Sequence, residues 1–127
     1  MGLLDLPVYL VEEIARNGHS MKILSTQQMN EVDRLTEVEF GIPTLLLMEN
    51  AGSSLHSTLE SYFEDLESEL IAIVCGKGNN GGDGIVLARH LTQLQIYPDV
   101  YLLGKVEEVS GDARTNLDAY LDTGETV

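Results

Sequence analysis

A nine-residue stretch rich in glycine constrains the fold of this chain more than any other feature. It spans residues 76–84, and its sequence is GKGNNGGDG. The apolar run 70–75 before it is typical of a fully buried strand, and apolar residues recur at helical spacing over 85–94. The stretch is therefore predicted to be a strand-to-helix turn. In such a turn the backbone bends sharply and its N–H groups can point at a bound anion.

The elements predicted around this turn indicate an α/β protein. Ser25 and Gln28 match a capping box before a helix that Gly41 would end, and a second helix is predicted to start after Thr44 and to include Tyr62. A second strand is predicted over 100–103. Strand, helix and strand at this spacing form a βαβ unit, for which parallel strands and a right-handed crossover are expected.

The sheet predicted from this pattern is too small to be complete. Ser110 is expected to cap a helix that ends at Gly124, and residues 125–127 could open a third strand. Typical sheets have about four to six strands. The predicted fold is therefore a three-layer α/β/α Rossmann-like arrangement with a parallel sheet, incomplete as it stands, which a further segment or another chain would complete.

The chain is predicted to divide into residues 1–20 and a domain over 21–127. The first segment could form a short helix that ends at Asn17-Gly18, and a second start follows at Met21. Both a leader and a natural extension are consistent with this pattern.

The net charge and the cysteine content limit the partners and the cellular compartment that fit this chain. The formal net charge is −14, from 21 acidic and seven basic residues, which argues against nucleic acid and against an anionic membrane surface. Cys75 is the single cysteine, so no intrachain disulfide can form and a reducing compartment fits. The apolar runs are too short to span a bilayer. A soluble, cytoplasmic protein is expected.

The glycine pattern by itself does not identify the ligand. Gly76, Gly78 and Gly81 satisfy G-x-G-x-x-G between a strand and a helix. A redox dinucleotide site also needs an acid at the end of the second strand, whereas Asp99 lies at the opposite end of that strand, which weakens this reading. An ATP-binding P-loop is excluded, because Gly81 is not followed by Lys-Ser or Lys-Thr.

The polar residues of the stretch are the candidate site. Asn79 and Asn80 offer neutral amide oxygens, which suit a hard cation or the amide and hydroxyl groups of a ligand. Asp83 is expected at the N-cap of the following helix, where the helix dipole favours a carboxylate. The alternative is that Asp83 is only a cap and Asn79 a left-handed turn residue.

Other reactive residues are assigned structural roles. Cys75 is expected to be a core thiol, and Asn116 is expected to be solvated, with a position in the crevice as the alternative. Glu49 could face a ligand or lie on a polar helix face. The three histidines lack the spacing of metal ligands.

Three segments, residues 74–84, 88–91 and 47–52, resemble the YjeF N-terminal domain family, the NAD(P)H-hydrate epimerases. The resemblance covers roughly Lys22 to Tyr120. Many members have proline in place of Lys77, where a lysine could also reach a phosphate.

The resemblance implies a function and a site. Such proteins interconvert the R and S forms of hydrated NADH and NADPH, called NADHX and NADPHX. It implies that a substrate-binding segment lines the dinucleotide site and consists of Asn79, Asn80, Gly81, Gly82 and Asp83, with Asn80 also contributing to a potassium site. It further implies a homodimer and a fused or paired ADP/ATP-dependent dehydratase.

The resemblance also implies that part of the site lies elsewhere. The family's catalytic aspartate is expected beyond Val127, and the residues up to Val127 offer no convincing acid/base for proton transfer. The chain would then carry half a site and be inactive alone. Two alternatives are a non-catalytic binding or scaffold domain and an NAD-dependent oxidoreductase. The oxidoreductase is disfavoured because the second strand lacks an acidic residue at its end that would bind the ribose.

Overall fold

The computed structural model describes residues 23–127. The chain divides into two units, Met1–Ile42 and Pro43–Val127. The short helix predicted within residues 1–20, and the predicted boundary at residue 20, lie outside the described residues. Within the described part of the chain, no helix is long and apolar enough to cross a membrane.

Helix α1 (Thr26–Phe40) is the described element of the first unit. The predicted capping box is present: the Gln28 N–H donates to Ser25 Oγ (3.3 Å), and the Ser25 N–H donates to Gln28 Oε1 (2.9 Å). Gly41 follows the helix with a φ of 66°, a left-handed conformation that favours glycine. Both predicted ends of this helix are confirmed.

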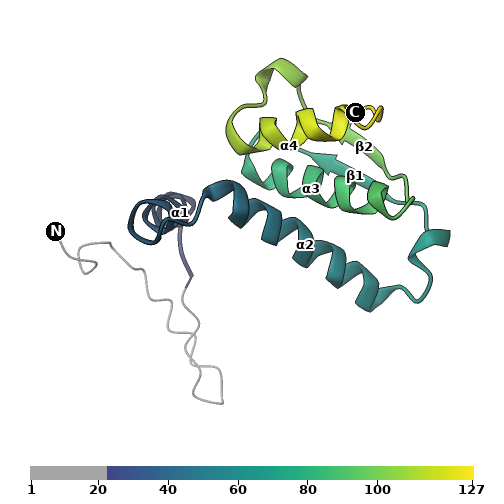
Figure 1. The fold of residues 1–127 in the computed structure, drawn as a ribbon, viewed down its shortest axis with the longest axis horizontal. Helices are drawn as coiled ribbons and strands as arrows, with labels where there is room; N and C mark the ends of the chain where they lie inside the picture. The colour runs from purple at the N-terminus through teal and green to yellow at the C-terminus, as the bar shows by residue number, and fades with distance from the viewer. Residues whose placement is uncertain (1–22) are drawn as a thin grey trace, which may run out of the picture. The chain divides into compact units, whose positions relative to one another are not determined.

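The second unit contains the glycine-rich stretch and a two-stranded sheet (Figure 1). Its elements are α2 (Thr44–Tyr62), η1 (Leu66–Ser68), β1 (Ala72–Cys75), α3 (Asn79–Gln93), β2 (Asp99–Leu102), η2 (Val106–Glu108) and α4 (Gly111–Leu121). The strands pair in parallel, with Ile73 opposite Val100 and Cys75 opposite Leu102. The predicted βαβ unit and the α/β class are confirmed. No strand forms over residues 125–127, and α4 ends at Leu121 rather than at Gly124.

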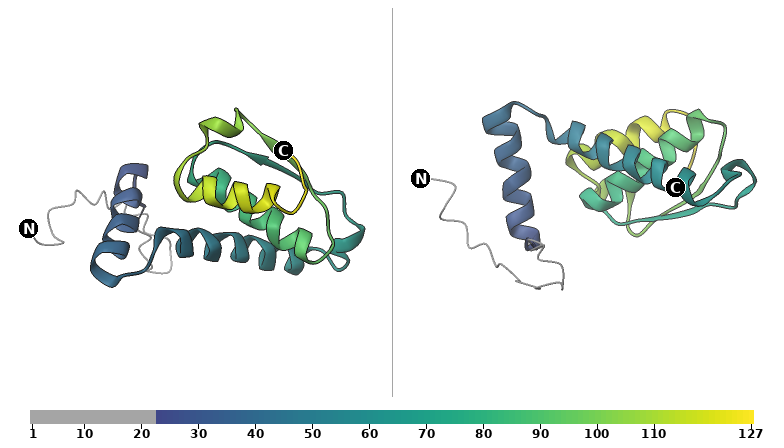
Figure 2. Two further views of the ribbon diagram at one scale, coloured as in Figure 1. Left: turned by 45° about the horizontal axis from the view of Figure 1, so that its top comes forward. Right: turned by 90° about the horizontal axis from the view of Figure 1, so that it is seen from below.

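Helices α2, α3 and α4 lie on one face of this sheet (Figure 2). Ile73, Cys75 and Val100 point to that face and are buried. Val74 and Tyr101 point the other way and are 64% and 55% exposed. The prediction of a fully buried strand is therefore wrong, because the described residues supply helices to only one side. The second helical layer of the predicted α/β/α fold is not formed by them.

Small residues let α2 and α3 run close together. A Cβ added to Gly52 of α2 would lie 2.3 Å from Val86 Cγ1, and one added to Gly82 of α3 would lie 2.5 Å from Met48 Sδ. Val86 and Met48 are both buried. This contact fixes the start of α3 against α2, and so positions the candidate site.

Candidate functional site

The glycine-rich stretch joins the carboxyl end of β1 to the start of α3, as predicted, but the helix begins earlier than expected. Its N-cap is Gly78, and the Gly82 N–H donates to the Gly78 carbonyl (3.0 Å). Asp83 is the fifth helical residue, so its predicted N-cap role is wrong. Gly81 and Gly82 belong to the helix despite their low helix propensity, because tertiary contacts outweigh that propensity.

Three of the glycines are required by close packing. A Cβ on Gly81 would lie 1.9 Å from the Gly76 carbonyl oxygen, and one on Gly84 would lie 2.9 Å from Cys75 Sγ. Gly82 is confined by Met48, as described above. None of residues 76–84 has a positive φ, so the alternative that Asn79 is a left-handed turn residue is wrong.

The other end of the stretch is open. Gly76 and Gly78 have no atom within 4 Å of an added Cβ, and Asn79 and Asn80 are exposed in the first turn of α3. The N–H groups of these asparagines precede the first intrahelical bond and donate to no described residue. They lie at the positive end of the helix dipole, where an anion is stabilised.

The loop after β2 meets the glycine stretch. Lys77 Nζ lies 3.4 Å from Glu108 Oε1, and the aliphatic part of Lys77 crosses Gly104, whose φ is 147°. The Lys105 N–H donates to Glu108 Oε2 (2.9 Å). This bond and the Lys77 ammonium lower the pKa of the Glu108 carboxyl. Glu108 is not predicted from the sequence as a site residue, because it lies beyond β2 and only the turn of η2 brings its carboxylate back to Lys77.

A second polar cluster joins the three helices of this unit. Arg89 Nη1 donates to Asn116 Oδ1 (2.6 Å) and lies 3.2 Å from Glu49 Oε2. His90 Nε2 lies 2.6 Å from Glu49 Oε1. Asn116 is only 3% exposed, so the prediction that it is solvated is wrong. The cluster satisfies buried polar groups between helices, which is a structural role for Glu49.

Cys75 is a core residue, as expected. The Cys75 side chain is buried, and burial raises the pKa of its thiol, so it is a core residue rather than a nucleophile. Across residues 23–127, no group of three or more His, Cys, Asp or Glu side chains is arranged to hold a metal ion.

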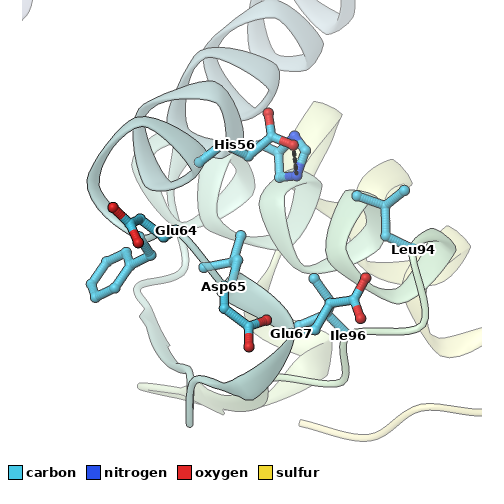
Figure 3. Close-up of a pocket in the computed structure, with 9 residues that line it drawn as sticks. His56, Glu64, Asp65, Glu67, Leu94 and Ile96 are labelled. Carbon is cyan, nitrogen blue, oxygen red and sulfur yellow. Dashed lines mark ion pairs between the residues drawn. The ribbon is translucent and has the colours of Figure 1, made fainter.

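A hollow of about 550 Å³ lies at the C-terminal end of α3, where Leu94 and Ile96 help to line it (Figure 3), and none of its lining residues belongs to the glycine stretch. Its walls include His56, Leu94 and Ile96, and four carboxylates surround it: Glu60, Glu64, Asp65 and Glu67. These carboxylates would repel the phosphates of a nucleotide. The start of α3 is therefore the better candidate for an anionic ligand.

Comparisons with known proteins show the family to which the second unit belongs. The family described as "YjeF-related protein N-terminus" matches residues 44–127. The bifunctional NAD(P)H-hydrate repair enzyme Nnr of Moorella thermoacetica is 44% identical over 105 residues, which are 82% of this chain and 20% of that protein. The NAD(P)H-hydrate epimerase of Oenococcus oeni is 40% identical over 95 residues, 74% of this chain and 44% of that protein.

A solved structure supports the fold. The crystal structure of yeast ynu0 matches with a TM-score of 0.64 and 28% identity, over 84% of this chain and 46% of that one. The chain thus spans less than half the length of each of these relatives. Since the family match includes the whole βαβ unit with the glycine-rich stretch, the chain belongs to the family of YjeF-related protein N-terminal domains.

Proposed function

We propose that this chain carries the dinucleotide-binding half of an NAD(P)H-hydrate epimerase, an isomerase of nicotinamide nucleotide repair. The observation that carries the proposal is the open start of α3, where exposed Asn79 and Asn80 accompany main-chain N–H groups that donate to no described residue. The relatives named as epimerases and repair enzymes supply the substrate class, NADHX and NADPHX.

In this proposal the residues of the chain bind and orient the substrate. The N–H groups at the start of α3 hold a phosphate, and the asparagine side chains donate to or accept from its polar groups. Gly81 and Gly82 let the start of α3 pack closely against Gly76 and Met48. Asp83 belongs to the same substrate-binding segment. Directed local donors are needed because the net charge of −14 repels an anionic ligand.

Epimerisation next to the ring nitrogen requires proton transfer at the hydroxyl-bearing carbon, and hence a positioned acid or base. Asp83 is helical and half-buried, and it is not proposed for this role. The catalytic aspartate is proposed to come from sequence beyond Val127. The chain alone is therefore proposed to bind but not to turn over.

The donor chemistry of Asn80 fits the potassium ion that the family implies. Asn80 is exposed in the first turn of α3, and its neutral amide oxygen suits a hard monovalent cation, which takes oxygen ligands. Asn80 would supply one such ligand, and others would come from outside the described residues. The bound ion would supply positive charge near the phosphates.

A second candidate function is a non-catalytic binding or scaffold domain. The exposed apolar side chains on the free face of the sheet, Val74 and Tyr101, favour it because they offer a surface for another protein. A homodimer is proposed, and a fused or paired dehydratase is proposed because relatives are named bifunctional NAD(P)H-hydrate repair enzymes. A cytoplasmic location is proposed on the single buried thiol.

The experiment adds one epimer of NADPHX to the 127-residue chain in potassium or sodium buffer and measures binding by calorimetry and the epimer ratio by chromatography. We expect binding that is tighter in potassium, with no conversion of the epimer. Full turnover would contradict the proposal that the chain carries only half of the active site. Absence of nucleotide binding would exclude the epimerase function and favour the non-catalytic binding or scaffold domain.

The matched variants are Asn80→Ala and Asn30→Ala. Asn30 is an exposed asparagine of α1, so its replacement removes the same chemical group outside the proposed site. We expect Asn80→Ala to abolish the potassium dependence and Asn30→Ala to retain it. Equal behaviour of the two variants would contradict the role of Asn80.

A further inference from the structure

The ion pair between Lys77 and Glu108 connects the loops that follow the two strands. Lys77 lies in the glycine stretch after β1, and Glu108 ends η2 after β2. A Cβ on Gly104 would lie 2.6 Å from Lys77 Cδ and 3.1 Å from Glu108 Oε2. The lysine therefore reaches the carboxylate across the one residue at the end of β2 that has no side chain.

Glu108 is held in place as an anion. The Lys105 N–H donates to its Oε2 at 2.9 Å, and its pKa is lowered by this bond and by the Lys77 ammonium. The side chains of Lys77 and Glu108 remain 47% and 46% exposed. A bound molecule can therefore reach both charges without any rearrangement of the backbone.

In βαβ dinucleotide sites in general, a side chain at the position of this pair contacts the adenosine ribose. When the pyrophosphate lies at the first helix N-terminus, the adenosine ribose lies at the end of the second strand. There an acidic side chain accepts the ribose 2′-hydroxyl, and a basic one accommodates a 2′-phosphate. Here Glu108 and Lys77 place one group of each kind at the end of β2.

We propose that Lys77 and Glu108 together determine whether the bound dinucleotide carries a 2′-phosphate, with Lys77 attracting that group and Glu108 opposing it. This inference rests on the proposed function, since it assumes a dinucleotide at the start of α3. It adds a specificity-determining pair to that site. The two residues act in opposite directions on NADP-type ligands.

The test is calorimetric titration of the 127-residue chain with NADP⁺ and with NAD⁺. Lys77→Met keeps the aliphatic chain over Gly104 and removes the charge. We expect it to raise the Kd for NADP⁺ about tenfold, as for the loss of one charged contact, and the Kd for NAD⁺ less than twofold. We expect Glu108→Gln to lower the Kd for NADP⁺ several-fold and to raise that for NAD⁺.

The matched controls are Arg34→Met, which removes one positive charge from the exposed Arg34–Glu31 ion pair of α1, and Glu107→Gln, which removes one negative charge from an exposed residue beside Glu108. We expect both to change either Kd less than twofold. If Lys77→Met and Glu108→Gln weaken both nucleotides equally, the pair only braces the two loops and the inference is wrong. If wild type binds neither nucleotide, the proposed function fails and this inference fails with it.

Discussion

The glycines at the two ends of the stretch 76–84 have different physical roles. Gly81, Gly82 and Gly84 have backbone or core atoms where a side chain would begin, whereas Gly76 and Gly78 face open space. The first group lets α3 pack against β1 and α2. The second group leaves the main chain accessible beside Asn79 and Asn80. One sequence motif thus serves both packing and binding, and substitutions can separate the two.

Gly81→Ala should have the largest effect. Its Cβ would lie 1.9 Å from the Gly76 carbonyl oxygen, and a backbone atom cannot move aside without displacing the start of α3. We expect a loss of at least about 3 kcal/mol in the free energy of unfolding, measured by urea denaturation. Gly76→Ala is the control, and a similar loss there would contradict the distinction between the two groups.

Gly82→Ala should have an intermediate effect. Its Cβ would meet Met48 Sδ at 2.5 Å, which is near the flexible end of a side chain and can shift. We expect a loss of about 1–2 kcal/mol in urea. Combined with Met48→Val, the loss should fall short of the sum of the single losses by at least about 0.5 kcal/mol. Additive losses would show that Met48 is not the group that confines Gly82.

Gly78→Ser should separate stability from binding. Serine is a preferred N-cap residue, and its Oγ can accept an N–H of the first turn of α3. We expect the free energy of unfolding to rise by about 0.5 kcal/mol and the affinity for NADP⁺ to fall several-fold, because the serine occupies a donor that the ligand needs. Calorimetry with Gly78→Ala as the control tests this, and unchanged affinity would show that these donors do not bind the ligand.

The smallest effect concerns the titration of Glu108. Its pKa is lowered in the folded chain, so its contribution to stability is present above the pKa of the unfolded state and is lost as the pH falls through the folded value. Lys77→Met should raise the pKa of Glu108, although the Lys105 N–H keeps it below normal. Carboxyl NMR titration measures both values. An unchanged pKa would show that the ion pair does not form in solution.

Local signals in the sequence predict the two ends of α1 and the pairing of the strands. The Ser25 and Gln28 capping box and the Gly41 terminus depend on neighbours within four residues, so the sequence contains them in full. The sequence predicts too late a start for α3, because Gly81 and Gly82 have low helix propensity but pack within the helix against Gly76 and Met48. Such contacts join residues that the sequence does not show to be close.

Contacts between residues far apart in the sequence also limit how much of the candidate site can be predicted. Asn79 and Asn80 were identified from the motif, and their exposure in the first turn of α3 fits a binding role that remains a prediction. The burial of Asn116 depends on Arg89, 27 residues away, and the position of Glu108 depends on a turn after β2. Neither residue belongs to a recognisable pattern in the sequence.

The most direct measurement is the mapping of backbone amide shifts in ¹H–¹⁵N NMR spectra as NADP⁺ is added. If the start of α3 holds the dinucleotide, the N–H signals of Gly78, Asn79, Asn80 and Gly81 will move most, and in a saturable way. Signals that stay in place there, while those around the acidic hollow at Glu64 and Asp65 move or nothing moves, would contradict the account.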